Sequence, residues 1–198
     1  KDDVDIIYNG LLCESSMPVK SANPIFTLLA VGRLDKIKGF DILIKEVSTL
    51  DFPFYLNIVG EGEEKEHLEK LIVEFGLSEK VTLLGYREDI PFLVAAADLV
   101  VISSHSEGFG RVLVETLFYG DLIISTKVGL SMEILPDELL IEDFEIAKKI
   151  VEVYSHREDY HTLFIALKKM QTKAFLLENI SKEYSHYYQY ILNKTKND

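Results

Sequence analysis

The sequence predicts a doubly wound α/β domain, built on a parallel sheet of about six strands and followed by C-terminal helices. From residue 25 to about residue 142, short apolar runs alternate with amphipathic stretches, as repeated strand–helix units do. The runs are continuously apolar rather than alternating with polar residues, which indicates strands covered on both faces. After about residue 143 the pattern is helical to the end of the chain.

The first half of this pattern is the clearest. A strand is expected over 25–31, and the helix over 39–50 places apolar residues at helical spacing. The next strand, over 54–59, is followed by a helix over 63–75, and Gly76 ends that helix as glycine commonly does just past a helix C-terminus.

The remaining elements continue the alternation. Strands are expected over 81–84, 98–103, 122–125 and 139–141, and helices over 91–97 and 111–119. Helices over 144–154, 156–170 and 172–193 complete the chain. We therefore expect three regions: a linker or approach segment over 1–24, a Rossmann-like α/β domain over 25–155, and C-terminal helices over 156–198.

Composition limits the functions that the chain can perform. The 198 residues carry a net charge of −12, so bulk binding to nucleic acid or to anionic membranes is not expected. No apolar run approaches the roughly 18 residues of a membrane span. The single cysteine, Cys13, excludes an internal disulfide and a cysteine-based zinc site, which fits a cytoplasmic protein.

Three loops that follow predicted strands carry unusual residues, and ligands of open α/β sheets bind at that edge. The first loop holds Arg33, Lys36 and Lys38 just before a helix, between Gly32 and Gly39. Cations beside a helix N-terminus form an anion site. The same residues are equally compatible with a solvated turn.

The second loop runs from Ser103 into the helix that begins at Arg111, and it contains Gly108 and Gly110. These glycines let backbone amides approach a ligand closely. Glu107 and Glu115 flank the loop and could accept hydrogen bonds from sugar hydroxyls. Alternatively, Glu107 only suits the helix dipole, and Glu115 is only a surface charge on the helix.

The third loop, Val128–Glu133, is a glycine turn in which Ser131 is expected to cap a helix. Other candidate motifs are incomplete. Gly60-x-Gly62 and Gly108-x-Gly110 lack the third glycine of the dinucleotide fingerprint, and no P-loop occurs. The five histidines show no metal-ligand spacing, and we interpret His105 as a loop-packing residue.

Taken together and in this order, the motifs resemble the C-terminal, donor-binding half of family 4 retaining glycosyltransferases of the GT-B type. The resemblance runs from residue 6 to about residue 142. Its most specific part is Ser104-x-Ser106-Glu107-Gly108-Phe109-Gly110 with a second glutamate, Glu115, eight positions after the first. Thr116, Asp121-Leu122 and Leu130 depart from the usual pattern.

The resemblance implies a role for each matching residue. Arg33 and Lys38, beside Gly32, would hold the diphosphate, Glu107 the hexose and Glu115 the ribose. Backbone amides would line the sugar and phosphates, from Gly108, Phe109, Gly110, Arg111, Val112 and Leu113. The base would lie near Gly85, Tyr86 and Arg87. Because the chain lacks a convincing Asp-x-Asp motif, no metal and no cofactor is expected.

The resemblance implies a Rossmann-like half of a GT-B fold and a hexosyltransferase activity. The donor would be a nucleoside-diphosphate sugar, most simply a UDP-sugar. The glycan or lipid-linked acceptor would bind an N-terminal domain that precedes residue 1, and the full-length enzyme could associate peripherally with a membrane. A tyrosine-rich helix near Tyr184–Tyr190 resembles the terminal helix that packs across that domain. Two alternatives stay open: a non-catalytic nucleotide-sugar-binding module, and a phosphorylase-like or epimerase-like enzyme.

Overall fold

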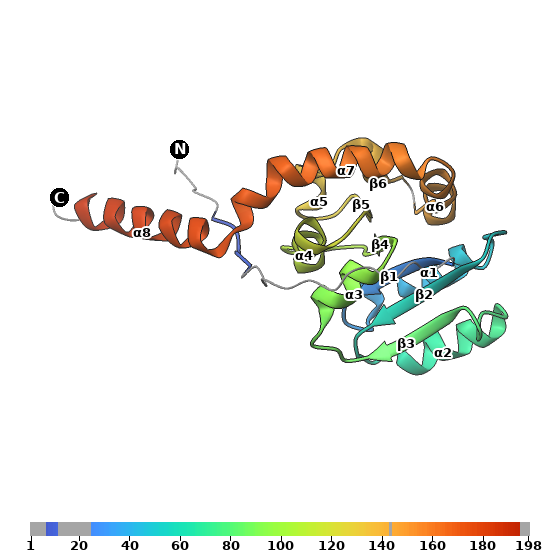
Figure 1. The fold of residues 1–198 in the computed structure, drawn as a ribbon. Helices are drawn as coiled ribbons and strands as arrows, with labels where there is room; N and C mark the ends of the chain where they lie inside the picture. Colours follow the sequence, from blue (N-terminus) through green and yellow to red (C-terminus); the bar gives the residue numbers. More distant parts are fainter. Residues whose placement is uncertain (1–6, 12–24, 143, 195–198) are drawn as a thin grey trace.

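The computed structural model describes residues 7–11, 25–142 and 144–194 (Figure 1). Six parallel strands form one sheet in the order β3-β2-β1-β4-β5-β6, which confirms the predicted doubly wound architecture. The strands are β1 (Phe26–Val31), β2 (Phe54–Val59), β3 (Val81–Gly85), β4 (Leu99–Ile102), β5 (Ile123–Thr126) and β6 (Leu140–Ile141).

Helices connect and follow these strands. The α-helices are α1 (Phe40–Val47), α2 (Lys65–Glu74), α3 (Ile90–Ala96), α4 (Arg111–Tyr119), α5 (Ser131–Ile134), α6 (Ile146–Ser155), α7 (Arg157–Gln171) and α8 (Leu177–Lys194). Three short 3-10 helices are η1 (Lys36–Lys38), η2 (Asp137–Leu139) and η3 (Thr172–Phe175). Strand β2 and helix α4 have the predicted bounds, and most of the other predicted elements shift at their ends by a few residues.

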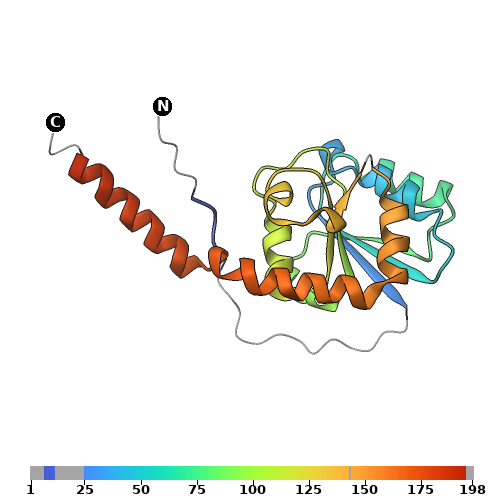
Figure 2. The same cartoon turned by 90° about the horizontal axis from the view of Figure 1, so that it is seen from above.

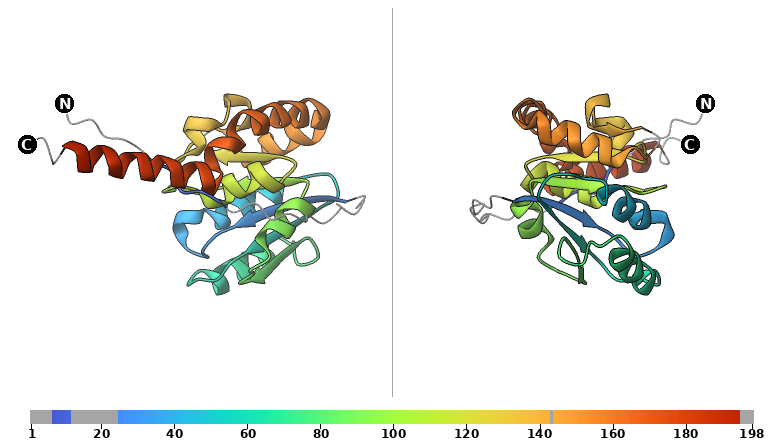
Figure 3. Two further views of the ribbon diagram at one scale, coloured as in Figure 1. Left: turned by 60° about the vertical axis from the view of Figure 1, so that its left-hand side comes forward. Right: turned by 90° about the vertical axis from the view of Figure 1, so that its right-hand side faces the viewer.

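The helices lie in two layers, one on each face of the sheet (Figures 2 and 3). Helix α1 packs with α2 and α6, while α3 packs with α4. Every residue of β4 and β5 is buried between these layers, as the continuously apolar runs predict. Helix α7 packs against α4 and leads into α8, which projects away from the domain (Figure 1).

The prediction of one continuous helix over 172–193 is wrong. Leu176 has extended backbone angles (φ −66°, ψ 129°) and separates η3 from α8. The break has a tertiary cause, because Leu176 forms a parallel bridge with Leu11. The Leu11 amide donates to the Phe175 carbonyl at 2.9 Å, and the buried Phe175 turns toward the core.

Most of the predicted linker over 1–24 lies outside the described residues. Its described part, residues 7–11, forms no strand and runs beside the junction of η3 and α8. Gly10 comes so near this junction that a Cβ atom there would lie 2.7 Å from Leu177 Cα. The approach segment and the C-terminal helices therefore meet at one point of the fold.

Strand order decides where a ligand can bind. The chain adds β2 and β3 on one side of β1, then returns to place β4 on the other side. In doubly wound sheets the crevice lies at such a switch point, outside the carboxyl ends of the strands. Here the switch lies between β1 and β4, so the loops that leave these two strands must face one another.

Asp98 lies at the opposite edge of the sheet and has a structural role. It is buried, and its Oδ2 accepts from the Thr27 amide at 2.7 Å, while Oδ1 pairs with Arg157 of α7. The residue thus links the beginnings of β1 and β4 to α7. Asp98 therefore stabilises the fold and does not line the ligand crevice.

Candidate functional site at the β1–β4 switch point

The loop after β1 is shaped by Asp35 and Gly39. The Asp35 side chain caps η1 by accepting from the Lys38 amide at 3.2 Å, and it also pairs with Arg33 at 2.9 Å. Gly39 adopts a left-handed conformation (φ 61°), and a Cβ there would lie 2.3 Å from the Ser103 carbonyl oxygen. Only glycine lets this loop approach β4 so closely.

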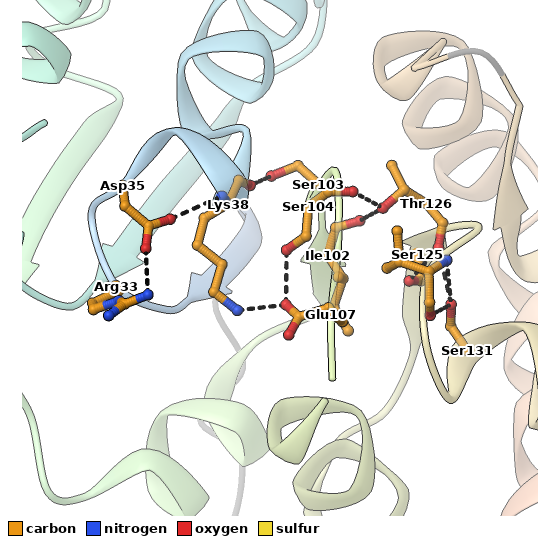
Figure 4. Close-up of polar contacts among 11 residues, drawn as sticks. Arg33, Asp35, Lys38, Ile102, Ser103, Ser104, Glu107, Ser125, Thr126 and Ser131 are labelled. Atoms are coloured by element: carbon orange, nitrogen blue, oxygen red, sulfur yellow. Dashed lines mark hydrogen bonds and ion pairs between the residues drawn. The ribbon is translucent and has the colours of Figure 1, made fainter. Parts of the chain in front are cut away.

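The loop after β4 is joined to the first loop by an ion pair (Figure 4). Lys38 Nζ donates to Glu107 Oε1 at 2.5 Å, and Ser104 Oγ donates to the same oxygen at 2.8 Å. Both charged side chains are largely buried, at 20% and 15% exposure. Two residues that the sequence singled out in separate loops therefore form one pair.

Buried hydroxyl groups hold the backbone beneath this pair. Ser103 Oγ donates to the Lys38 carbonyl at 2.8 Å, and Thr126 Oγ1 donates to the Ser104 carbonyl at 2.6 Å (Figure 4). Gly129 completes the support, because a Cβ at this residue would lie 2.8 Å from the Glu107 carbonyl oxygen. The loops after β1, β4 and β5 are thus fixed to one another.

Ser131, expected to cap a helix, acts differently. It is the first residue of α5 rather than its cap, and its hydroxyl donates to the Thr126 carbonyl at 2.9 Å. The hydroxyl therefore ties the third loop back to the end of β5. His105 lies at the rim of the second loop, where its ring packs on Phe144 at a centroid distance of 4.7 Å.

A cleft of about 740 Å³ opens beside these loops. It is lined by the ends of β1, β2 and β3, by the beginning of α3, and by one face of α4. Three arginines line it together with three glutamates, Glu61, Glu88 and Glu115. The predicted site residues among its lining are Gly32, Arg33, Arg87, Arg111, Val112 and Glu115.

Glu115 is the buried carboxylate of this cleft. It lies in the second turn of α4, is 7% exposed, and accepts from Arg111 at a distance of 3.4 Å. Burial raises the pKa of Glu115, because the charged form loses hydration, while the charge of Arg111 opposes this rise in pKa. A hydrogen-bonding ligand that replaces the lost water would stabilise the ionised carboxylate.

The far end of the cleft lies after β3. Arg87 forms a two-pronged pair with Asp89 at 2.8 and 2.6 Å, and Tyr86 is 67% exposed. The hydrogen bond from Arg87 lowers the pKa of Asp89, so this carboxylate stays ionised. Tyr86 and Arg87 both line the cleft, and an aromatic ring and a flat guanidinium are each suited to contact a planar group.

The other predicted site residues lie beside the cleft rather than in its lining. Lys38 and Glu107 form the ion pair, and Gly108 follows it. Gly110 is left-handed (φ 72°) at the start of α4, and Leu113 is buried with its amide donating to the Gly110 carbonyl at 3.0 Å. The Phe109 ring packs near Tyr8 and Phe175, with centroid distances of 6.3 and 6.2 Å.

Sequence reasoning missed the supporting hydroxyls of Ser103, Ser104 and Thr126. Their signal was present, since each follows or ends a buried strand, where an unpaired hydroxyl would be unfavourable. It also missed the hydrogen bond from Tyr8 Oη to Glu133, which joins residues 125 positions apart. Short polar side chains are common after strands, so neither feature stands out without coordinates.

The residues that the structure describes form neither a metal-ligand cluster nor a membrane-spanning helix. No three His, Cys, Asp or Glu side chains gather there as a metal site would require. In the same part of the chain, no helix combines the length and the apolar character that crossing a bilayer demands.

The comparisons with known proteins agree with this architecture. The family model for glycosyl transferases group 1 matches residues 18–170. The chain is 38% identical over 126 residues to a Campylobacter jejuni N-acetylgalactosaminyltransferase named for a diphospho-undecaprenol acceptor, covering 62% of this chain and 34% of that protein. It is 36% identical over 100 residues to the lipopolysaccharide core glycosyltransferase LpsE of Rhizobium meliloti, covering 50% and 29%.

Among solved structures, HepE of Anabaena in complex with UDP-glucose superimposes with a TM-score of 0.79. The two share 28% identity, and the match covers 84% of this chain and 49% of HepE. The C-terminal domain of LpcC from Francisella tularensis shares the fold at a TM-score of 0.69 and 24% identity, covering 77% of this chain and 87% of that one.

The extent of these matches is itself informative. The chain spans about half the length of HepE, and about a third of the Campylobacter jejuni and Rhizobium meliloti glycosyltransferases. The shared part is the Rossmann-like half that carries the switch-point crevice, the C-terminal domain of the GT-B fold. The family model covers well over half of the chain. The chain therefore belongs to the glycosyl transferases group 1 family.

Proposed function

We propose that this chain is the donor-binding half of a retaining family 4 glycosyltransferase, which moves a hexose from a UDP-sugar to a glycan or lipid-linked acceptor. One observation carries the proposal. Three arginines and the buried carboxylate of Glu115 line a single cleft at the switch point, together with the exposed Glu61 and Glu88, and an ion pair of Lys38 and Glu107 lies beside it. Cations suit a diphosphate, and carboxylates suit sugar hydroxyls.

The diphosphate is assigned to Arg33, Lys38 and the N-terminus of α4. Arg33 is 75% exposed on its side chain, so it can turn from Asp35 toward a ligand at small cost. The first amides of a helix have no partner within the helix and favour an anion. As the bond to the sugar breaks, negative charge gathers on the departing diphosphate, and these groups stabilise it.

Ribose and base are assigned to the body of the cleft. Glu115 faces the cleft from α4 and would accept from the ribose hydroxyls. The base would lie toward Tyr86 and Arg87, which line the far end after β3. This order places the diphosphate between the ribose and the loops that leave β1 and β4, where the hexose would contact Glu107.

The proposal draws support from two relatives. HepE was solved with UDP-glucose, which is a UDP-sugar, and the Campylobacter enzyme is named for a lipid-linked diphosphate acceptor. We propose by analogy that the acceptor binds the half of the enzyme outside this match. The reaction would take place in the cytoplasm, with peripheral membrane contact when the acceptor is lipid-linked.

Calorimetry on the 198-residue chain tests the donor assignment. We expect saturable binding of UDP and UDP-glucose, weaker binding of uridine, and weaker binding as salt concentration rises. Lys45→Ala, which removes an exposed cation on α1, is the matched control and should leave the affinities unchanged. Failure of the chain to bind UDP or UDP-glucose at millimolar concentration would contradict the proposal.

A further inference from the structure

Ser104 is a buried polar residue that is held at both ends. It is the second residue after β4, is 2% exposed, and its carbonyl accepts from Thr126 Oγ1 at 2.6 Å. Its own hydroxyl donates to Glu107 Oε1 at 2.8 Å (Figure 4). A hydroxyl this deeply buried needs a hydrogen-bond partner. Here the partner is the side chain of Glu107, the residue proposed to bind the hexose.

In the described part of the chain, the polar side-chain contacts of Glu107 involve only one of its two carboxylate oxygens. Among the residues that the structure describes, both polar partners of the carboxylate, Lys38 and Ser104, donate to Oε1. Two donors on one oxygen fix the plane of the carboxylate, and they leave Oε2 to accept from a ligand. The orientation of Oε2 is therefore determined by groups on the opposite side of the carboxylate.

The two donors differ in mobility. Lys38 has a long flexible side chain and is the residue assigned to the diphosphate, so its bond to Glu107 is shared or lost when a donor binds. Ser104 has one short side chain on a backbone held by Thr126, and it has no competing task. Loss of a hydrogen bond from a neutral group to a charged one changes an equilibrium constant by roughly tenfold or more when the charged partner stays in place.

We propose that Ser104 is a positioning residue, which holds the carboxylate of Glu107 so that Oε2 faces the donor hexose while Lys38 turns to the diphosphate. This inference rests on the proposed function for the identity of the ligand. The coupling between Ser104 and Glu107 does not, because it is a property of the ligand-free chain.

A double-mutant cycle on unfolding tests the coupling without any ligand. Ser104→Ala, Glu107→Gln and the double variant are unfolded in urea and compared with the wild-type chain. We expect the two substitutions to be non-additive by at least about threefold in the unfolding equilibrium constant, as contacting residues are. The matched control is Ser106→Ala, an exposed serine two positions on, which should be additive with Glu107→Gln. If the effects of Ser104→Ala and Glu107→Gln on the unfolding equilibrium constant combine to within twofold of the effect of the double variant, the proposal is overturned.

A second measurement tests the direction of the effect. Where the wild-type chain binds UDP-glucose more tightly than UDP, Ser104→Ala should lower the affinity for UDP-glucose about tenfold and leave that for UDP within twofold. Ser104→Thr, which keeps the hydroxyl, should restore the preference. Equal losses for both ligands would reduce Ser104 to a structural residue and overturn the proposal. If the wild-type chain binds neither ligand, the proposed function fails, while the cycle still decides whether Ser104 orients Glu107.

Discussion

Lys38 Nζ and Glu107 Oε1 lie 2.5 Å apart although 69 positions separate the residues in the sequence. The contact follows from the strand order, because β1 and β4 are neighbours and their carboxyl ends share one edge of the sheet. In the ligand-free chain each charge satisfies the other. A donor that binds here must offer phosphate oxygens to Lys38 and hydroxyl groups to Glu107 in exchange.

Removing either cation of the first loop should weaken binding of a nucleoside diphosphate. Arg33→Ala and Lys38→Ala each lose a charge-assisted bond of about 1.5–3 kcal/mol, or roughly ten- to a hundredfold in affinity. Calorimetry with UDP at low salt measures the loss, and Lys45→Ala is the control. Wild-type affinity in both variants would mean that the diphosphate lies elsewhere.

The same two variants should differ in stability. Lys38→Ala leaves the largely buried Glu107 without its cation, which costs on the order of 1–3 kcal/mol of unfolding free energy. Arg33→Ala removes an exposed cation and should change the unfolding free energy by less than about 1 kcal/mol. Urea unfolding at pH 7 compares them, and equal destabilisation would contradict the geometry described for Lys38.

The raised pKa of Glu115 has a consequence for stability against pH. The folded state favours the protonated carboxyl, so its contribution is fully present below the unfolded pKa and is lost as pH rises through the folded pKa. Glu115→Gln has no such titration. The variant should therefore gain stability relative to the wild-type chain as pH rises above the ordinary glutamate pKa of about 4. Urea unfolding across this range measures the difference, and a constant difference would show that burial does not perturb Glu115.

Alanine substitutions at Gly60 and Gly76 test how closely the crevice loops pack against one another. Both glycines are at positive φ, at 141° and 66°, but a Cβ at Gly60 would lie 1.8 Å from the Gly32 carbonyl oxygen while nothing lies within 4 Å at Gly76. Gly76→Ala should cost only backbone strain, about 1–2 kcal/mol. Gly60→Ala should cost clearly more and should also weaken binding of UDP, because the loop after β1 has to move.

Much of the fold could be predicted from the sequence because its signals are local. Continuous apolar runs indicated the buried strands, and helical spacing indicated α1, α2 and α4. The break at Leu176 could not be predicted in this way, since it depends on a bridge to Leu11 at the other end of the chain. Local propensity favours a helix there, and a distant backbone partner overrides it.

The candidate site was predictable by residue type but not by arrangement. Arg33, Lys38, Glu107 and Glu115 stood out as charges in glycine loops. That Lys38 pairs with Glu107, and that Arg87 and Arg111 line the same cleft as Arg33, depends on strand order. Ser103 and Thr126 carry no distinctive spacing, and Ser104 stood out only as part of the resemblance. The supporting role of these three hydroxyls is identified by their burial and hydrogen bonds.

The most direct test of the whole account compares Glu107→Gln with Glu115→Gln, using UDP and UDP-glucose as ligands of the same chain. Glu115 is assigned to the ribose, which both ligands contain, so its variant should bind both more weakly. Glu107 is assigned to the hexose, which UDP lacks, so its variant should bind UDP normally and lose only the preference for UDP-glucose. The opposite pattern, with UDP affinity dependent on Glu107 and independent of Glu115, would contradict the account.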